Sequence, residues 1–286
     1  MIKRALLFVF LCLLLCSCKS IDISKALDMG FTTVQATSQA SRPISDEEEY
    51  YIGRAVAARI FVSYPLLKNQ NLTKYINTIG RVIALHSEKP FTYGGYHFAI
   101  LNTNEINAFA CPGGTILITR GMIELAQNEE ELASILAHEI AHINHRDGIN
   151  SIKQARWTEA LTIIGTKALK EYGPAELSNL VSIFEGSIDD VFKTLVVNGY
   201  GRTQEYSADE TAVLYLSKAG YDPYALISVL ERLNQFGKKG GGGIIKTHPE
   251  TIDRIENLKN KIPPAQIDSN IIHYRAQRFK SFISAR

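Results

Sequence analysis

A short segment near the middle of the chain constrains the fold more than any other feature. It is HEIAH at positions 138–142, and it lies within residues 129–145, where leucine and isoleucine recur at helical spacing. That spacing predicts a mostly buried helix. His138 and His142 are four residues apart, so they lie one turn apart on the same face of the helix. Because ionisable side chains on a buried helix need a partner, the segment predicts a bound metal ion.

The residue types in this segment favour zinc. Catalytic zinc commonly has two histidines and one glutamate as protein ligands and keeps one coordination position open. His138 and His142 would be two of these ligands. Glu139 follows the first ligand directly, where its carboxylate would act as a general base. The alternative is a structural helix that happens to carry two histidines.

A third ligand must come from elsewhere in the chain. The metzincin pattern HExxHxxGxxH fails, because His145 and Gly148 stand where it requires glycine and histidine. Glu205, some sixty residues downstream, opens a predicted helix and shares one face of it with Asp209. Glu205 would bind the metal, and Asp209 would orient a ligand imidazole. Taken alone, this pair is also compatible with a solvated helix face.

Further motifs accompany HEIAH in a fixed order. They are the strand-like NAFA before PGG at 107–114, the sequence EYSAD at 205–209, THP at 247–249, and Arg254. Together they resemble the gluzincin metalloproteases that include the CAAX prenyl endopeptidases, HtpX and periplasmic proteases of the BepA and LoiP type (metallopeptidase family forty-eight). The similarity covers about residues 46–261. No membrane-spanning apolar stretch follows the N-terminus, so a LoiP-like lipoprotein is the nearest match.

The resemblance implies a zincin-like fold and a role for each matching residue. His138, His142 and Glu205 would hold one Zn²⁺ per chain, with Glu139 as the general base. Asp209 would orient one of the ligand histidines without binding the metal itself.

Two residues near the C-terminal end of the similar region can be interpreted in more than one way. His248 would either stabilise the oxyanion or cover the zinc in a resting state, and a helix-capping histidine is the structural alternative. Arg254 would pair with an aspartate or with the substrate, or form a structural salt bridge. His145 is expected to be a surface histidine at the end of its helix.

The residues before HEIAH predict where a substrate would bind. Asn107, Ala108 and Phe109 match the edge strand of the family. An edge strand has unpaired backbone groups, and an extended peptide can add to it as a further strand.

The N-terminus has the pattern of a bacterial lipoprotein leader. Lys3 and Arg4 precede the apolar run 5–15, and the sequence then ends in LCSC at 15–18, which resembles a lipobox. Residues 1–17 would be the signal peptide, Cys18 the lipidated residue, and residues 18–45 a flexible tether to the membrane. By resemblance, Lys19 favours the outer membrane. An ordinary secretory signal or an uncleaved anchor is the alternative.

Composition limits the remaining possibilities. The chain has 31 basic and 29 acidic residues, and loss of Lys3 and Arg4 with the leader leaves 29 of each. Such a balance argues against nucleic acid as a partner. Once the leader is removed and Cys18 acylated, Cys111 is the one remaining thiol, and we expect it to be a small buried residue.

The periodicity predicts an α+β domain over residues 46–286, mainly helical with a small sheet. Strands are expected at 96–101, 106–111 and 115–119, the last two forming a hairpin. Helices are expected at 46–63, 71–86, 122–127, 129–145, 149–172, 175–198, 203–219, 223–236, 249–260 and 270–283. The glycine-rich segment 237–243 is expected to be a mobile loop.

The sequence therefore predicts a zinc endopeptidase of the cell envelope, on the periplasmic face of the outer membrane. A water activated by Glu139 would attack the peptide carbonyl, and misfolded or damaged envelope proteins would be the substrates. The alternative from another class is a chaperone or assembly factor that binds polypeptides and seldom cleaves them. Because the three candidate ligands and the candidate base are all present, the sequence favours the enzyme over the binding protein.

Overall fold

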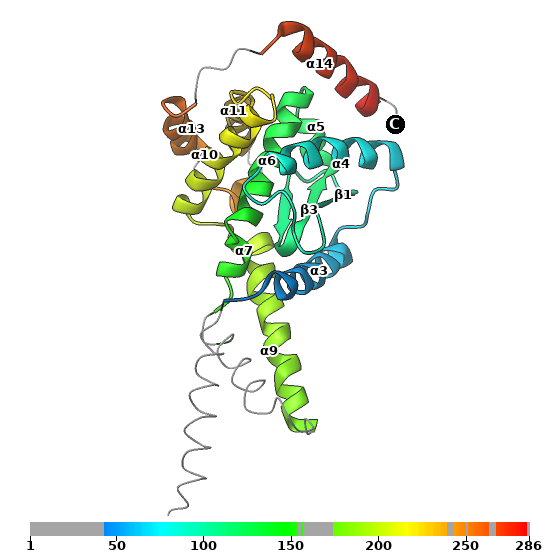
Figure 1. Cartoon of the computed structure of the whole chain (residues 1–286), viewed down its shortest axis with the longest axis vertical. Helices are drawn as coiled ribbons and strands as arrows, with labels where there is room; N and C mark the ends of the chain where they lie inside the picture. The colour runs from blue at the N-terminus through cyan, green and yellow to red at the C-terminus, as the bar shows by residue number, and fades with distance from the viewer. Residues whose placement is uncertain are drawn as a thin grey trace, which may run out of the picture. The chain divides into compact units, whose positions relative to one another are not determined.

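The structure is a computed structural model, and it describes residues 43–153, 156, 174–238, 243–249, 251–262 and 267–284 (Figure 1). The chain divides into two units, one of residues 1–42 with 157–180 and one of residues 43–156 with 181–286. The site lies within the second unit. The predicted signal peptide, the lipidation site Cys18 and nearly all of the predicted tether lie outside the described residues.

A sheet of three strands forms the centre of the second unit. Its strands β1 (His97–Leu101), β2 (Ala108–Cys111) and β3 (Thr115–Thr119) stand in the order β1-β3-β2. β1 runs parallel to β3, while β2 runs antiparallel to it. The turn Pro112–Gly114 joins β2 to β3 and needs glycine, because φ is 75° at Gly113 and 114° at Gly114. The three strands and the hairpin are thus confirmed, and β2 lies at an edge.

The other elements of the described residues are helices, which confirms a mainly helical fold with a small mixed sheet. They are α3 (Asp46–Ser63), α4 (Gln70–Leu85), α5 (Arg120–Leu125), α6 (Glu129–Asn144), α7 (Asp147–Asn150), α9 (Pro174–Lys193), the π-helix η2 (Thr194–Asn198), α10 (Arg202–Lys218), α11 (Ala225–Lys238), α12 (Ile244–Thr247), α13 (Thr251–Lys259) and α14 (Ser269–Ser284). None of the helices in the described ranges combines the length and the apolar character that a membrane crossing requires.

The helix that carries HEIAH is α6, and it is buried along nearly its whole length. Residues 129–143 are all buried, and the Asn128 side chain accepts the N–H of Glu131 to cap the helix. α6 contacts β2, α4, α10, α11 and α14, in the middle of the unit (Figure 1). Because neighbouring elements pack tightly against α6, its polar side chains can adopt few conformations.

The first helix, α3, begins as its sequence predicts. The Ser45 side chain accepts the N–H of Glu48, and the Glu48 side chain accepts the N–H of Ser45. Further along, the buried Glu49 accepts the N–H of Gly113 and pairs with Arg146. These contacts fix α3 against the turn that joins β2 to β3.

Two predicted segments are wrong in part. A helix over 149–172 does not start as expected, because α7 ends at Asn150 and residues 151–153 are not helical; most of the remainder lies outside the described residues. Arg146, with φ of 59°, separates α7 from α6. The glycine-rich segment is shorter than predicted, since Gly237 and Lys238 still belong to α11. Its residues 239–242 lie outside the described residues.

Candidate metal centre

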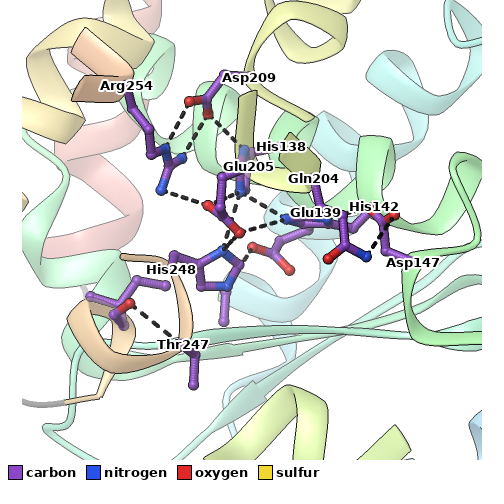
Figure 2. Close-up of polar contacts among 12 residues, drawn as sticks. His138, Glu139, His142, Asp147, Gln204, Glu205, Asp209, Thr247, His248 and Arg254 are labelled. Atoms are coloured by element: carbon purple, nitrogen blue, oxygen red, sulfur yellow. Dashed lines mark hydrogen bonds and ion pairs between the residues drawn. The ribbon is translucent and has the colours of Figure 1, made fainter. Parts of the chain in front are cut away.

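Four buried side chains from three parts of the chain meet in one cluster (Figure 2). His138 and His142 come from α6, Glu205 from α10, and His248 from the residue after α12. One potential ligand atom from each residue lies within 4.8 Å of those of the other three. The three ligands implied by the sequence are therefore brought together, and His248 lies with them.

Each of the two histidines from α6 has a carboxylate next to its Nδ1 atom. The Nδ1 atom of His138 lies 3.0 Å from Oδ1 of Asp209, and the Nδ1 atom of His142 lies 2.7 Å from Oδ2 of Asp147. An ionised carboxylate only accepts hydrogen bonds, so it favours a proton on Nδ1, and in the neutral form of each ring Nε2 then presents a lone pair. The two Nε2 atoms lie 3.0 Å apart. Two lone pairs this close repel unless a proton or a metal ion lies between them, so these residues fit a metal ion.

The electrostatics of the cluster agree with a cation site. Burial alone would lower the pKa of His142, but hydrogen bonds to Asp147 and Glu205 raise it to about 10. Burial and the neighbouring His142 lower the pKa of His138. Burial would raise the pKa of Glu205, yet the positive charges of His248 and Arg254 hold it well below its usual range. The cluster thus combines an ionised carboxylate with two imidazoles, and a positive charge on His142 disfavours a second one on His138.

Arg254 links the carboxylates on α10. It forms a two-pronged pair with Asp209, with both N–O distances at 2.7 Å, and its Nη1 atom lies 2.7 Å from Oε2 of Glu205. Only 2% of Arg254 is exposed. Among the predicted roles of Arg254, the geometry corresponds to a pair with an aspartate inside the site.

Glu139 lies next to the cluster without belonging to it. Its side chain is buried, and its Oε2 atom has no hydrogen-bond partner within the described part of the chain. Its Oε1 atom lies 4.0 Å from Nε2 of His248. A buried carboxylate oxygen without a donor is available to accept a proton from a molecule that enters the site.

His248 is both a helix-capping residue and a member of the cluster. As the C-cap of α12, it donates its backbone N–H to the carbonyl of Ile244, the first residue of that helix. Its Nδ1 atom lies 2.9 Å from Oε1 of Glu205 and 3.3 Å from Nε2 of His138. The side chain therefore occupies a place that a fourth metal ligand would take.

Two residues of the site were not predicted from the sequence, Asp147 and Tyr200. Asp147 contacts His142 because the left-handed Arg146 turns the chain back after α6. Tyr200 stacks on the ring of His142, with centroids 4.1 Å apart, and its buried hydroxyl has no hydrogen-bond partner among the described residues. No motif marked Asp147, but an acidic residue five positions after a ligand histidine was a usable signal.

The residues expected to stay outside the cluster do so. His145 is half-buried at the end of α6 and bonds the Thr211 hydroxyl. Cys111 is a free, buried thiol on β2, and burial raises its pKa. Neither belongs to the group of potential metal ligands.

The strand that was predicted to bind the substrate, Asn107 to Phe109, lies at or just before β2 on the edge of the sheet. Its backbone groups are not all unpaired, which corrects one expectation. The Asn107 side chain accepts the N–H of Ala108 at 2.9 Å, and the carbonyl of Ile106 accepts the N–H of Ile244 at 2.9 Å. A segment of the chain itself thus covers the start of this edge.

Comparison with known proteins agrees with the geometry. The model of Peptidase family M48 matches residues 66–262. The chain is 26% identical over 255 residues to the beta-barrel assembly-enhancing protease of Escherichia coli (strain K12), covering 87% of this chain and 52% of that protein. For the Yersinia pestis protein of the same name, the identity is 28% over 233 residues, covering 78% and 46%.

A mitochondrial relative is also similar. The mitochondrial metalloendopeptidase OMA1 of Saccharomyces cerevisiae is 27% identical over 190 residues, covering 64% of this chain and 51% of that protein. The chain spans about half the length of the curated relatives it matches.

Proposed function

The chain belongs to peptidase family M48, and from this premise we propose that it is a zinc-dependent endopeptidase of the bacterial cell envelope. The observation that carries the proposal is the buried cluster of His138, His142 and Glu205 with Glu139 beside it. The names of its relatives, a protease and a metalloendopeptidase, support peptide bonds as the target.

His138, His142 and Glu205 would hold the zinc ion. Zinc supplies Lewis acidity toward a water molecule and a peptide carbonyl. Glu139 takes a proton from the attacking water and later passes it to the leaving amine, a role that its unpartnered Oε2 atom supports.

The neighbouring carboxylates and Arg254 prepare these residues for that task. Asp209 and Asp147 keep the proton of each ligand imidazole on Nδ1, so that both Nε2 atoms face the metal. Arg254 keeps Glu205 and Asp209 ionised in a buried setting, because its charge offsets the effect of burial on the pKa of each carboxyl.

His248 covers the metal in a resting state under this proposal. Its distances to Glu205 and His138 support that role over oxyanion stabilisation, because the side chain stands among the ligands. Removal of the side chain in His248→Ala should therefore raise the rate at which the zinc-loaded protein cleaves an unfolded substrate. A lower rate with the same zinc content would favour the oxyanion role.

The envelope location rests on the leader and on the predicted lipidation of Cys18. The tether 18–45 would hold the catalytic domain near the periplasmic face of the outer membrane, where misfolded or damaged envelope proteins would be substrates. Extended segments of these proteins would add to the edge strand at Asn107, Ala108 and Phe109. Replacement of Cys18 by alanine should release the protein from the membrane fraction, and retention there would contradict lipid anchoring.

A binding protein that seldom cleaves is the alternative, and Glu139→Gln separates the two. The variant keeps the shape of the side chain but loses the base, so cleavage of an unfolded protein should fall by about 10² to 10⁴-fold. Glu231→Gln, on the exposed face of α11, is the matched control and should cleave like the parent. Full proteolysis by Glu139→Gln would rule out the proposed mechanism.

A further inference from the structure

An apolar pocket lies beside the proposed ligand His138 and the proposed base Glu139, which form part of its wall. Helix α11 contributes four apolar side chains to the wall, Leu226, Val229, Leu230 and Leu233. The free volume of the pocket is about 20 Å³. That is room for about one water molecule, so the pocket is nearly full as it stands.

Ile244 of α12 forms part of the wall of this pocket. Its side chain is only 3% exposed, and it lines the pocket together with the side chain of His248. The N–H of Ile244 also donates to the carbonyl of Ile106, just before the edge strand β2. Ile244 therefore makes at once the two kinds of contact that an extended peptide would make, one by its backbone to the sheet edge and one by its side chain to the pocket.

The local backbone brings Ile244 close to the sheet. Gly243 has φ of 68°, and a Cβ atom there would lie 2.6 Å from the carbonyl oxygen of Ile106. A larger residue at this position would push the segment away. Thr247, one turn later, contacts the Asn107 side chain, with its Oγ1 atom 3.4 Å from Oδ1. The segment from Gly243 to His248 thus runs from the sheet edge to the metal cluster.

We propose that this pocket is the main specificity subsite of the protease. It binds a branched aliphatic side chain, leucine, isoleucine or valine, next to the cleaved bond, and that side chain takes the place of Ile244. The inference rests on the proposed endopeptidase function and adds the class of residue that the substrate presents.

The chemistry of the wall determines this preference. The α11 side chains offer no hydrogen-bond partner, and Arg254, which also lines the pocket, is already paired with Asp209 and Glu205. A charged or amide side chain would therefore lose its hydration without compensation. An aspartate or glutamate would also approach Glu139. A substrate side chain of about the same volume as Ile244 would keep the pocket well packed when it takes the place of Ile244. A tryptophan side chain would be too large for the space.

The direct test uses the full-length, zinc-loaded chain and a set of fluorogenic peptides that differ at one position next to the cleaved bond. Isoleucine and leucine should exceed alanine by at least about 10-fold in kcat/KM, because one methylene in an apolar pocket already changes this ratio about 10 to 200-fold. Aspartate and tryptophan should fall below alanine. Equal kcat/KM for all five peptides would overturn the inference, whereas cleavage of none would instead contradict the proposed function.

A pair of variants locates the preference in this pocket. Leu233→Ala enlarges the pocket, so the ratio of kcat/KM for phenylalanine over isoleucine peptides should rise at least about 10-fold. Ile227→Ala removes a similar side chain from the same helix outside the pocket and should keep the parental ratio. Because each ratio is measured within one protein, a smaller folded fraction does not change it. An unchanged ratio in Leu233→Ala would overturn the assignment.

Discussion

Arg254 is the residue on which the buried charge of the site depends. Two carboxylates, Asp209 and Glu205, lie almost fully out of solvent and both contact its guanidinium. Burial alone would raise the pKa of the Asp209 carboxyl, and the adjacent charge of Arg254 lowers it instead. The same carboxylates raise the pKa of Arg254. Each of the three groups therefore stabilises the ionised form of the others.

Loss of Arg254 should be costly for this reason. Arg254→Ala leaves two buried carboxylates without their partner, and breaking such a pair costs about 3 to 5 kcal/mol. Arg202→Ala is the control, because its pair with Asp253 is about half exposed and should contribute less than about 1 kcal/mol. Urea unfolding of the zinc-free proteins measures both. A loss at Arg254 no larger than that at Arg202 would contradict this role.

Asp147 should affect the metal rather than the fold. Asp147→Asn cannot hold the Nδ1 proton of His142 as an ionised carboxylate does, so zinc affinity should fall about 10 to 100-fold. Competition with a chromophoric chelator measures this affinity. Asp253→Asn, on the exposed side of α13, is the matched control. Equal affinity in both variants would mean that Asp147 does not orient the ligand.

At the scale of elements, the contact between α3 and the β2–β3 turn is unusually close. Gly53 faces the carbonyl of Pro112, and a Cβ atom at position 53 would overlap that oxygen. Gly113 in the turn approaches the backbone of Tyr50 in the same way. The turn leads directly into β2, so this contact helps to position the edge strand.

Gly53→Ala tests that contact. Alanine is the better helix former by about 1 kcal/mol, so helix propensity alone predicts a more stable protein. Overlap with Pro112 should reverse the sign and cost about 1 to 3 kcal/mol in the free energy of unfolding. Ala58→Gly, on the exposed face of α3, gives the propensity effect by itself. A stabilised Gly53→Ala protein would show that the helix can move away from the turn.

The elements that the sequence predicts well are those with a long, one-sided pattern. α6 begins at Glu129 as expected and ends one residue early, because its apolar periodicity is continuous. α12 could not be predicted, since its four residues show no period. The contact of Ile244 was also out of reach, because it depends on the positive φ of Gly243. For Asp147 the sequence offered one signal, an acidic residue five positions after His142, although the contact itself depends on the left-handed turn at Arg146.

At the scale of the whole molecule, the C-terminal helix ties the end of the chain to the start of the ligand helix. Arg278 of α14 pairs with the fully buried Glu129, and Arg275 pairs with Glu130. Both acidic residues belong to the first turn of α6. α6, α10 and the segment before α13 together supply the cluster, so a metal ion there would join three parts of the chain.

Zinc should therefore stabilise the entire domain. A ligand that binds only the folded protein adds about 2.7 kcal/mol at 100 times its Kd. For a domain of this size, that corresponds to roughly 5 to 10 °C in Tm. Calorimetry with and without a chelator measures the shift, and zinc added back should restore it. The same Tm in both states would contradict a metal site inside the fold.

The central claim is that His138, His142 and Glu205 hold one catalytic zinc ion. The most direct measurement is the zinc content of purified Glu205→Gln, taken together with its rate of cleavage of an unfolded protein. The parent and the control Glu210→Gln, a change at a partly exposed residue of the same helix outside the cluster, should each hold about one zinc per chain and cleave. Glu205→Gln should lose both zinc and cleavage. Parental zinc content and parental cleavage in Glu205→Gln would contradict the account.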